Sequence, residues 1–308
     1  LSVSVLFDDN VDVATSNPEI DLTFGTMVGG PKAVYSAGTG TTTLTFDYTV
    51  ATGNEDTDGI DLAAAISLAG ATIQDTNGND SYLTLSSTNF PTVLIDAIQP
   101  TVTIDATSVI TNSNYLTYNM TGTCSENGQA VNVDIGGVSD SATCAALVWS
   151  TTTDVTAASE SADNTVADVA ITADHSDAGA NAAVQATDTQ IKDTILPTIS
   201  TNTIAANTYI IGDTIDMVVT FSEDVTPVGT ESIDLTIGVA TRNATQSATT
   251  ANSITYSYTV VENDLDSDGI AGAASITGGA GIVDAVGNAF GNVVPTTAFA
   301  TELVDGVR

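Results

Sequence analysis

The sequence predicts an all-β protein built of three tandem β-sandwich domains in an elongated array. Short segments alternate apolar and polar residues with a period of two, and turns rich in Gly, Asn and Asp separate them. No stretch shows a helical period, and the last third of the chain repeats motifs of the first third. At 308 residues the chain fits two or three domains, and a hydrophobic fraction of 42% lets each bury a core.

The internal repeat links the two ends of the chain. Five motifs of the first third recur in the same order in the last third, and the middle third lacks them. The paired segments are 7–11 and 221–225, 20–24 and 233–237, 44–50 and 254–260, 56–60 and 266–270, and 75–79 and 284–288. Because the order is kept throughout, we expect the first and third domains to share one fold.

The repeated segments have the pattern of half-buried strands. In residues 254–260, Ile, Tyr and Val alternate with Thr and Ser, so one face is apolar and the other polar. Residues 44–50 and 215–221 repeat this pattern. The middle third has its own alternating segments at 102–104, 116–120, 131–135 and 169–171. Successive strands joined by short turns favour antiparallel sheets packed face to face.

The domain boundaries are expected where an aspartate precedes a proline. Asp96 comes four residues before Pro100, and Asp193 four residues before Pro197. We place the domains at residues 1–99, 100–196 and 197–308. Such short joints stiffened by proline predict a semi-rigid rod.

The repeat also indicates that the first domain lacks its first strand. Aligning the two copies leaves residues 197–214 without a counterpart at the start of the chain. Two explanations remain open. The chain is a segment of a longer repeat array, or a strand from another copy or a neighbouring repeat completes the first domain by β-strand addition.

The middle domain holds both cysteines of the chain, Cys124 and Cys144. Two cysteines within one small β-domain favour a disulfide, and a disulfide implies an oxidising compartment outside the cytosol. A reduced, buried pair is the alternative. The single tryptophan, Trp149, follows the second cysteine on a predicted strand, and we expect its large apolar ring in the core.

The charge balance is extremely acidic. The chain has 38 acidic and 4 basic residues, a formal net charge of −34. Phosphate recognition requires Lys and Arg, so this composition excludes nucleic acid and anionic membranes as partners. No apolar run reaches the length of about 20 residues that a membrane helix requires, so no membrane insertion is expected. Self-repulsion of this size predicts screening by salt, by bound divalent cations or by both, unless the charge serves only solubility.

Several motifs resemble bacterial families of immunoglobulin-like repeats. Residues 221–225, the tyrosine-bearing segment 254–260 and residues 284–288 look like the Ig-like repeats of large surface adhesins. Residues 122–128, with Trp149 and residues 173–178, resemble a second type of bacterial Ig-like repeat. One departure puts the role of a loop in doubt, because residues 177–181 lack the glycine of the Asp-x-x-Gly-Asn turn.

The resemblance implies three Ig-like β-sandwiches in a secreted or cell-surface protein. Such repeats build adhesin stalks, surface layers and extracellular filaments, so a structural or adhesive segment is the expected function. The expected partners are other copies or neighbouring repeats. The alternative is a module that binds a carbohydrate or protein ligand at one loop end.

Candidate metal ligands come from two equivalent acidic loops. Residues 264–270 match the first half of an EF-hand calcium loop, although Ser275 stands where that loop needs a bidentate glutamate. The predicted calcium ligands are Asp264, Asp266, Asp268 and Asp284 in the third domain, and Asn54, Asp56, Asp58 and Asp75 in the first. The alternative is that these side chains cap their own turns. Asp96 and Asp193 could also hold an ion between domains.

Catalytic chemistry finds little support in the sequence. The single histidine, His175, lies in an acidic segment, where we expect a solvated side chain rather than a general base. Paired carboxylates are abundant, but nothing places two of them across a cleft as glycoside hydrolysis requires. The chain is not expected to be an enzyme.

Overall fold

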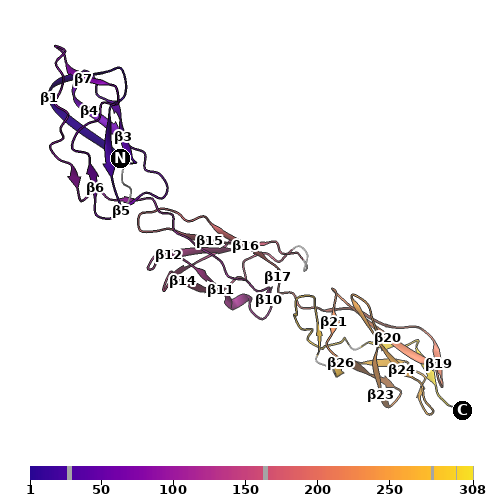
Figure 1. The fold of residues 1–308 in the computed structure, drawn as a ribbon. Helices are drawn as coiled ribbons and strands as arrows, with labels where there is room; N and C mark the ends of the chain where they lie inside the picture. Colours follow the sequence, from indigo (N-terminus) through magenta and orange to yellow (C-terminus); the bar gives the residue numbers. More distant parts are fainter. Residues whose placement is uncertain (26–29, 162–165, 279–280, 296, 308) are drawn as a thin grey trace.

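The computed structural model describes residues 1–25, 30–161, 166–278, 281–295 and 297–307. In Figure 1 the chain forms three bodies strung end to end, with the C-terminus at the far end of the last body. The described residues are almost entirely β, with a single 3-10 turn at Tyr115–Thr117. The predicted all-β fold class is therefore confirmed.

Buried apolar residues fall into three separate clusters, one in each third of the chain. Their buried members run from Val11 to Ile95, from Val102 to Ala173 and from Ile204 to Val304. We call the three parts the N-terminal, middle and C-terminal units. We keep residues 1–99, 100–196 and 197–308 as their proposed limits.

The N-terminal unit is built around one twisted sheet with the strand order β7-β1-β4-β3-β2-β6-β8. Its strands are β1 (Ser2–Ala14), β2 (Glu19–Thr23), β3 (Lys32–Ala37), β4 (Thr41–Asp47), β5 (Glu55–Asp56), β6 (Ile60–Leu62), β7 (Thr72–Asp75), β8 (Asn89–Phe90) and β9 (Ile95–Asp96). The inward face of the alternating pattern supplies the core, with Ile20, Leu44 and Phe46 fully buried.

The C-terminal unit repeats this arrangement with the order β18-β20-β24-β23-β22-β26-β28. Its strands are β18 (Ile199–Ile204), β19 (Thr208–Ile210), β20 (Thr214–Phe221), β21 (Thr226–Pro227), β22 (Glu231–Ile237), β23 (Ala240–Thr249), β24 (Ser253–Thr259), β25 (Leu265–Asp266), β26 (Ile270–Gly278), β27 (Ile282–Val283), β28 (Ala298–Phe299) and β29 (Leu303–Asp305). From β20 to β28 the strands follow the order of β1 to β8 in the N-terminal unit, and β20 and β21 together match the long strand β1. Two strands, β18 and β19, have no counterpart among the described N-terminal residues.

The middle unit has a different sheet pattern. Its strands are β10 (Ile110–Thr111), β11 (Tyr118–Thr123), β12 (Ala130–Ile135), β13 (Val138–Thr143), β14 (Val148–Thr153), β15 (Val169–His175), β16 (Ala186–Gln190) and β17 (Lys192–Asp193). A sheet of order β13-β12-β15-β16 packs with the β11–β14 pair, and β10 runs parallel to β17.

Both core predictions for the middle unit are confirmed. Cys124 and Cys144 form a disulfide, and Trp149 is 2% exposed. The indole nitrogen of Trp149 donates to the carbonyl of Thr103 at 3.0 Å. The ring lies against Gly122, where a Cβ atom would come within 2.0 Å of the Thr103 carbonyl oxygen, so the close packing requires glycine there.

Candidate metal centre

A cluster of three carboxylates lies at the joint between the middle and C-terminal units. Asp193 ends β17, Glu223 lies in the turn after β20, and Asp284 follows β27. One carboxylate oxygen of each lies within 4.8 Å of the others. Across the residues described, this is the only group of three or more Asp, Glu, His or Cys side chains close enough to share a metal ion.

Asp193 contributes a buried oxygen that has no hydrogen-bond partner. The residue is 2% exposed, and its Oδ1 accepts from the backbone amide of Ile195 at 3.0 Å. Its Oδ2 is buried and unpaired. Burial raises the pKa of Asp193, the Ile195 amide opposes this, and the charges of Asp284 and Glu160 add to it. A buried carboxylate oxygen without a donor is costly, and a cation would satisfy it.

Asp284 is fixed by its own turn and linked to the preceding unit. Its Oδ1 accepts from the amides of Val286 at 2.9 Å and Asn288 at 2.8 Å, and its Oδ2 accepts from Asn288 Nδ2 at 2.8 Å. Asn288 Nδ2 also donates to the Asp193 carbonyl at 2.8 Å, and its Oδ1 accepts from the amide of Asn112 at 2.9 Å. The Asn288 side chain therefore connects the C-terminal unit to two segments of the middle unit.

Glu223 completes the cluster, and its surroundings raise the pKa of its carboxyl group strongly. Burial, together with the charges of Asp193, Asp284 and Asp224, raises the pKa of Glu223 to about 7. The residue before it, Ser222, ties this turn to the first residues of the C-terminal unit by accepting from the amide of Thr198 at 3.0 Å. A raised pKa at a cluster of like charges is the condition under which a divalent cation replaces a proton.

The donor set fits a hard divalent cation. The three carboxylates supply only oxygen ligands, and calcium accepts six to eight such ligands in flexible geometries. Zinc or copper would favour histidine or cysteine, which the cluster lacks. In chemical terms the arrangement can bind a cation and fix the angle of the joint.

The joint between the N-terminal and middle units repeats the same bonds. Asp96, Glu126 and Asp177 occupy the positions of Asp193, Glu223 and Asp284, and they line a hollow of ≈ 320 Å³. Asn181 Nδ2 donates to the Asp96 carbonyl at 3.0 Å and to Asp177 Oδ2 at 2.8 Å. This joint is more open than the other, because Asp96 is exposed.

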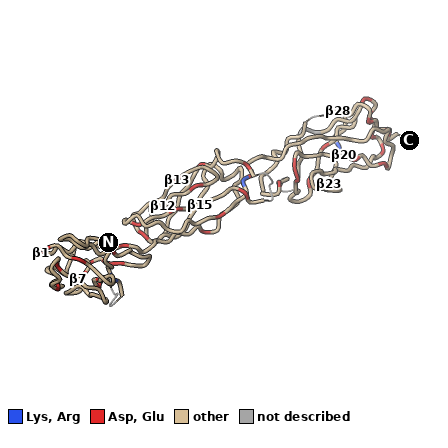
Figure 2. The backbone as a smooth tube through the Cα atoms, turned by 90° about the horizontal axis from the view of Figure 1, so that it is seen from above, with Lys and Arg blue, Asp and Glu red and all other residues tan. Residues whose placement is uncertain are grey.

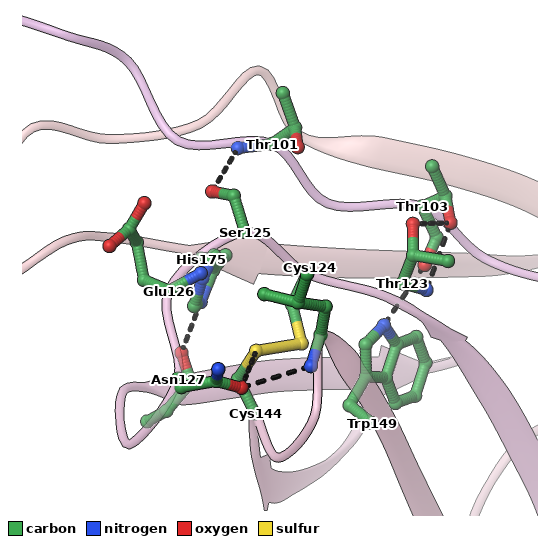
Figure 3. Close-up of a disulfide and its surroundings, with 12 residues drawn as sticks. Thr101, Thr103, Thr123, Cys124, Ser125, Glu126, Asn127, Cys144, Trp149 and His175 are labelled. Atoms are coloured by element: carbon green, nitrogen blue, oxygen red, sulfur yellow. Dashed lines mark hydrogen bonds between the residues drawn. A yellow bond between two sulfur atoms is a disulfide. The ribbon is translucent and has the colours of Figure 1, made fainter.

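The disulfide and the histidine position Glu126 in this second joint. Figure 3 shows Glu126 in the loop that begins at Cys124, beside His175. Nε2 of His175 accepts from the backbone amide of Glu126 at 3.2 Å, while Nδ1 bonds the carbonyl of Ala130 at 2.9 Å. The expectation of a solvated His175 is therefore wrong, since the ring is 2% exposed and lies on the inward face of β15.

The loop whose role was in doubt keeps the structure of its glycine-containing counterpart. Asp177 Oδ1 accepts from the amide of Asn181 at 2.8 Å, as Asp284 Oδ1 does from Asn288. Ala180 takes the place of Gly287 and adopts φ 68°, against 95° for the glycine. The turn therefore forms without glycine, at the cost of a left-handed alanine.

The predicted loop ligands of the C-terminal unit are held by protein donors. Asp264 is 1% exposed and binds Arg242 through NH2 at 2.6 Å, the Tyr258 hydroxyl at 2.6 Å and the Val261 amide at 3.0 Å. Asp266 accepts from backbone amides of its own turn and of Gly238, and Asp268 is exposed. The structure groups Asp284 with Asp193 and Glu223 rather than with these three residues. Calcium binding in the loop stays a prediction.

The equivalent residues of the N-terminal unit follow the same pattern. Asn54 Oδ1 accepts from the Tyr48 hydroxyl at 2.7 Å, and Asp56 Oδ1 accepts from the amides of Asp58 at 3.1 Å and Gly59 at 2.6 Å. Asp75 caps its own turn, because its Oδ1 accepts from the amides of Asn77 and Asn79. These bonds match the alternative in which the acidic side chains cap turns.

Sequence reasoning missed the two glutamates of the joints. Each follows the last core residue of a strand in the same short motif, Phe221-Ser-Glu and Cys124-Ser-Glu. The sequence could have indicated these glutamates through that shared motif, because it occurs in each unit that follows an Asp-x-x-x-Pro joint.

Comparisons with known proteins give neighbours in structure but none in sequence. No protein-family model and no curated protein sequence matches the chain. The chain is similar to a tetra-tandem repeat in the extending region of a large adhesion protein, with 18% identity and a TM-score of 0.29. That match covers 99% of this chain and 70% of the other. A putative membrane-anchored protein from Corynebacterium diphtheriae matches at 11% identity with a TM-score of 0.27, covering 99% and 86% of the two chains. The Escherichia coli adhesin FdeC matches at 13% identity with a TM-score of 0.37, covering 99% and 88%.

Within the described ranges, no helix has the length and apolar character needed to cross a bilayer.

Proposed function

We propose that the chain is a structural and adhesive segment of an extracellular or cell-surface protein, stiffened by calcium ions at its joints. The observation that supports this most is the Asp193, Glu223 and Asp284 cluster. It joins the last strand of one unit to two turns of the next and contains a buried, unpaired carboxylate oxygen. A cation there would couple the orientations of the two units.

The stiffening follows from the charges of the three carboxylates at the joint. Without a cation, three carboxylates within 4.8 Å repel one another and push the two units apart. A bound cation reverses the sign of that interaction. Because Asn288 already bonds Asp193 and Asn112 of the middle unit, little further ordering is needed on binding.

The experiment is a calcium titration of the intact chain followed by calorimetry and small-angle scattering. We expect heat of binding, a higher melting temperature of the C-terminal unit and a narrower distribution of maximum dimensions. At a calcium concentration one hundred times the Kd, the stabilisation should be about 2.7 kcal/mol. Glu223→Gln keeps the side-chain shape and should remove most of this response.

The matched control is Asp268→Asn, which removes an exposed carboxylate of the predicted loop. It should leave the joint response unchanged. A loss in Asp268→Asn with an unchanged response in Glu223→Gln would place the ion in the loop instead. A chain without binding heat in millimolar calcium would contradict the proposal.

A further inference from the structure

Among the described residues, the sheet of the N-terminal unit has an open edge along the first half of β1. Residues Ser2 to Leu6 of β1 pair with β4 on one side, and β7 pairs only with the later residues of β1, from Val11 to Ala14. Leu6 points outward and is 76% exposed. Exposed edges normally carry charge or proline that blocks pairing, and residues 1–7 have neither in their side chains.

The equivalent edge of the C-terminal unit is covered by β18. This strand pairs antiparallel with β20, with Ile199 opposite Phe221, Asn202 opposite Val219, and Ile204 opposite Met217. The repeat matches Leu1 with Ile215, Val3 with Met217, Val5 with Val219, and Phe7 with Phe221. The four C-terminal residues are at most 2% exposed, whereas the four N-terminal ones are only partly buried. The N-terminal core is therefore incomplete where β18 closes its relative.

A hollow lies in the place that a counterpart of β18 would fill. It measures ≈ 420 Å³ and is bounded on one side by residues 3–6 of β1 and on the other by residues 84–87 and Phe90. In the C-terminal unit the Asn202 side chain spans the same space. Its Nδ2 donates to the Pro295 carbonyl at 3.2 Å, and its Oδ1 accepts from the Thr297 hydroxyl at 2.9 Å.

The adjoining end of the N-terminal unit carries part of a joint. Asp9, Asp75 and Asn79 match Glu223, Asp284 and Asn288 in the repeat. Asn79 makes the same bonds within its turn, with its Nδ2 2.7 Å from Asp75 Oδ2. These three residues line a second hollow of ≈ 450 Å³ beside the first. In the other two joints an incoming aspartate faces this constellation, and Asp193 stands six residues before β18 begins.

We propose that this edge binds an extended strand from another repeat of the same type, antiparallel to β1. The strand would follow the pattern of residues 193–204, with an aspartate, a proline four residues later and apolar side chains at the positions of Ile199 and Ile204. Residues 197–204 carry no charge, so their approach to a chain of net charge −34 meets no repulsion. Main-chain hydrogen bonds supply the affinity, and the two isoleucines enter the half-filled core. The strand pairing does not depend on calcium at the joints.

The test uses a synthetic peptide of residues 197–205, which carries no charged side chain, added to the intact chain in the presence of a chelator. Hydrogen exchange read by mass spectrometry should show at least tenfold slower exchange at residues 2–6. The matched segment 217–220 of the same molecule should not change, because its edge is already occupied. A peptide in which both Ile199 and Ile204 are replaced by Asn should give no protection.

A second form keeps the test decisive if the free peptide binds weakly. A copy of residues 193–214 is placed directly before Leu1, which matches Ile215. We expect slower exchange at residues 2–6 and a melting temperature of the N-terminal unit raised by several degrees. A scrambled insert of the same composition is the control. Protection in this form alone still supports the proposal, because tethering raises the effective concentration of the strand. If neither form slows exchange at residues 2–6, the proposal is overturned, whatever the outcome of the calcium titration.

Discussion

At the scale of single residues, Ala180 and Gly287 show how one turn forms from two sequences. Both have positive φ in the turn that presents the joint aspartate. The left-handed conformation costs a residue with a Cβ about 1–2 kcal/mol, and glycine avoids this cost. The alanine turn keeps its shape because the Asn181 side chain and amide bond Asp177.

We expect Ala180→Gly to stabilise the middle unit by about 0.5–1 kcal/mol. Relief of the left-handed strain exceeds the extra freedom that glycine gives the unfolded chain. Urea denaturation followed by Trp149 fluorescence measures this unit alone, because the chain has one tryptophan. Gly287→Ala should change the C-terminal unit in the opposite direction. A destabilised Ala180→Gly variant would show that the alanine methyl packs favourably.

Glu223 makes the joint sensitive to pH. Its folded pKa of about 7 lies above the ordinary value of 4.5, so the folded state binds more protons between these limits. Stability from this group is therefore complete below pH 4.5 and is lost as the pH rises through 7.

In chelator, we expect the wild-type C-terminal unit to lose about 2 kcal/mol relative to Glu223→Gln between pH 4.5 and 7.5. The value is below the full shift because Glu223 is partly exposed. Denaturation of both proteins at several pH values measures the difference. Saturating calcium should abolish the wild-type loss. A constant difference between the proteins would mean that Glu223 titrates normally.

His175 and the joint glutamates show which residue positions the sequence could predict and which it could not. Val169, Ile171 and Ala173 alternate inward on β15, and His175 continues the same parity. The acidic residues near it suggested solvent instead, although the period of two already predicted burial. The Glu126 and Glu223 contacts cross unit boundaries, which no local pattern encodes.

At the scale of elements, the disulfide replaces an aromatic contact. In the C-terminal unit, Phe221 lies edge-on to Phe290 with ring centroids 5.3 Å apart, directly before Ser222 and Glu223. In the middle unit Cys124 takes the position of Phe221 and bonds Cys144. An aromatic contact in one unit and a disulfide in the other therefore stabilise equivalent turns that carry the joint glutamates.

We expect the double variant Cys124→Ser, Cys144→Ser to lose about 3 kcal/mol in the middle unit. The bond joins residues 20 positions apart, and closing a loop of that size restricts the unfolded chain by about this amount. Tryptophan fluorescence reports the loss, and calorimetry should show the other two units unchanged. An unaltered midpoint would indicate that the turn is held by hydrogen bonds alone, from the Glu126 amide to His175 and from the Leu147 amide to Asn127 Oδ1 at 2.9 Å.

The strand order of the two outer units was predictable only in part. The five repeated motifs established that the ends of the chain are related, because each motif falls on a strand or its turn. The order of the strands in the sheet depends on contacts between distant segments, which the repeat does not specify. The parallel pairs β10–β17 and β19–β29 are short and carried no recognisable signal.

At the scale of the whole molecule, charge is the dominant property. Figure 2 shows acidic residues along all three units and very few basic ones. The basic residues described are each paired with a carboxylate, Lys32 with Glu19 and Asp21, Lys192 with Glu160, and Arg242 with Asp264. The positive charges of these three residues are therefore balanced within their own units.

We expect sodium chloride to raise the melting temperature of all three units gradually between 0.05 and about 1 M, because screening shortens the range of repulsion from more than 10 Å to about 3 Å. Calcium should instead saturate and act at the joints. Parallel melting series in chelator with each salt distinguish the two effects. A saturable response to sodium, or equal responses to both at matched ionic strength, would contradict a specific divalent site.

The parallel strand pairs have a mechanical consequence. β17, at the end of the middle unit, runs alongside β10, and β29, at the end of the C-terminal unit, runs alongside β19, which precedes its core strands. A pull along the rod draws such partners in opposite directions and loads all their hydrogen bonds at once. In the N-terminal unit, β9 instead pairs antiparallel with β5, and the described strand pairs of this unit include no parallel one. Under tension this unit should therefore yield first and lengthen the rod, which force spectroscopy on the single molecule would record as an early, low-force step.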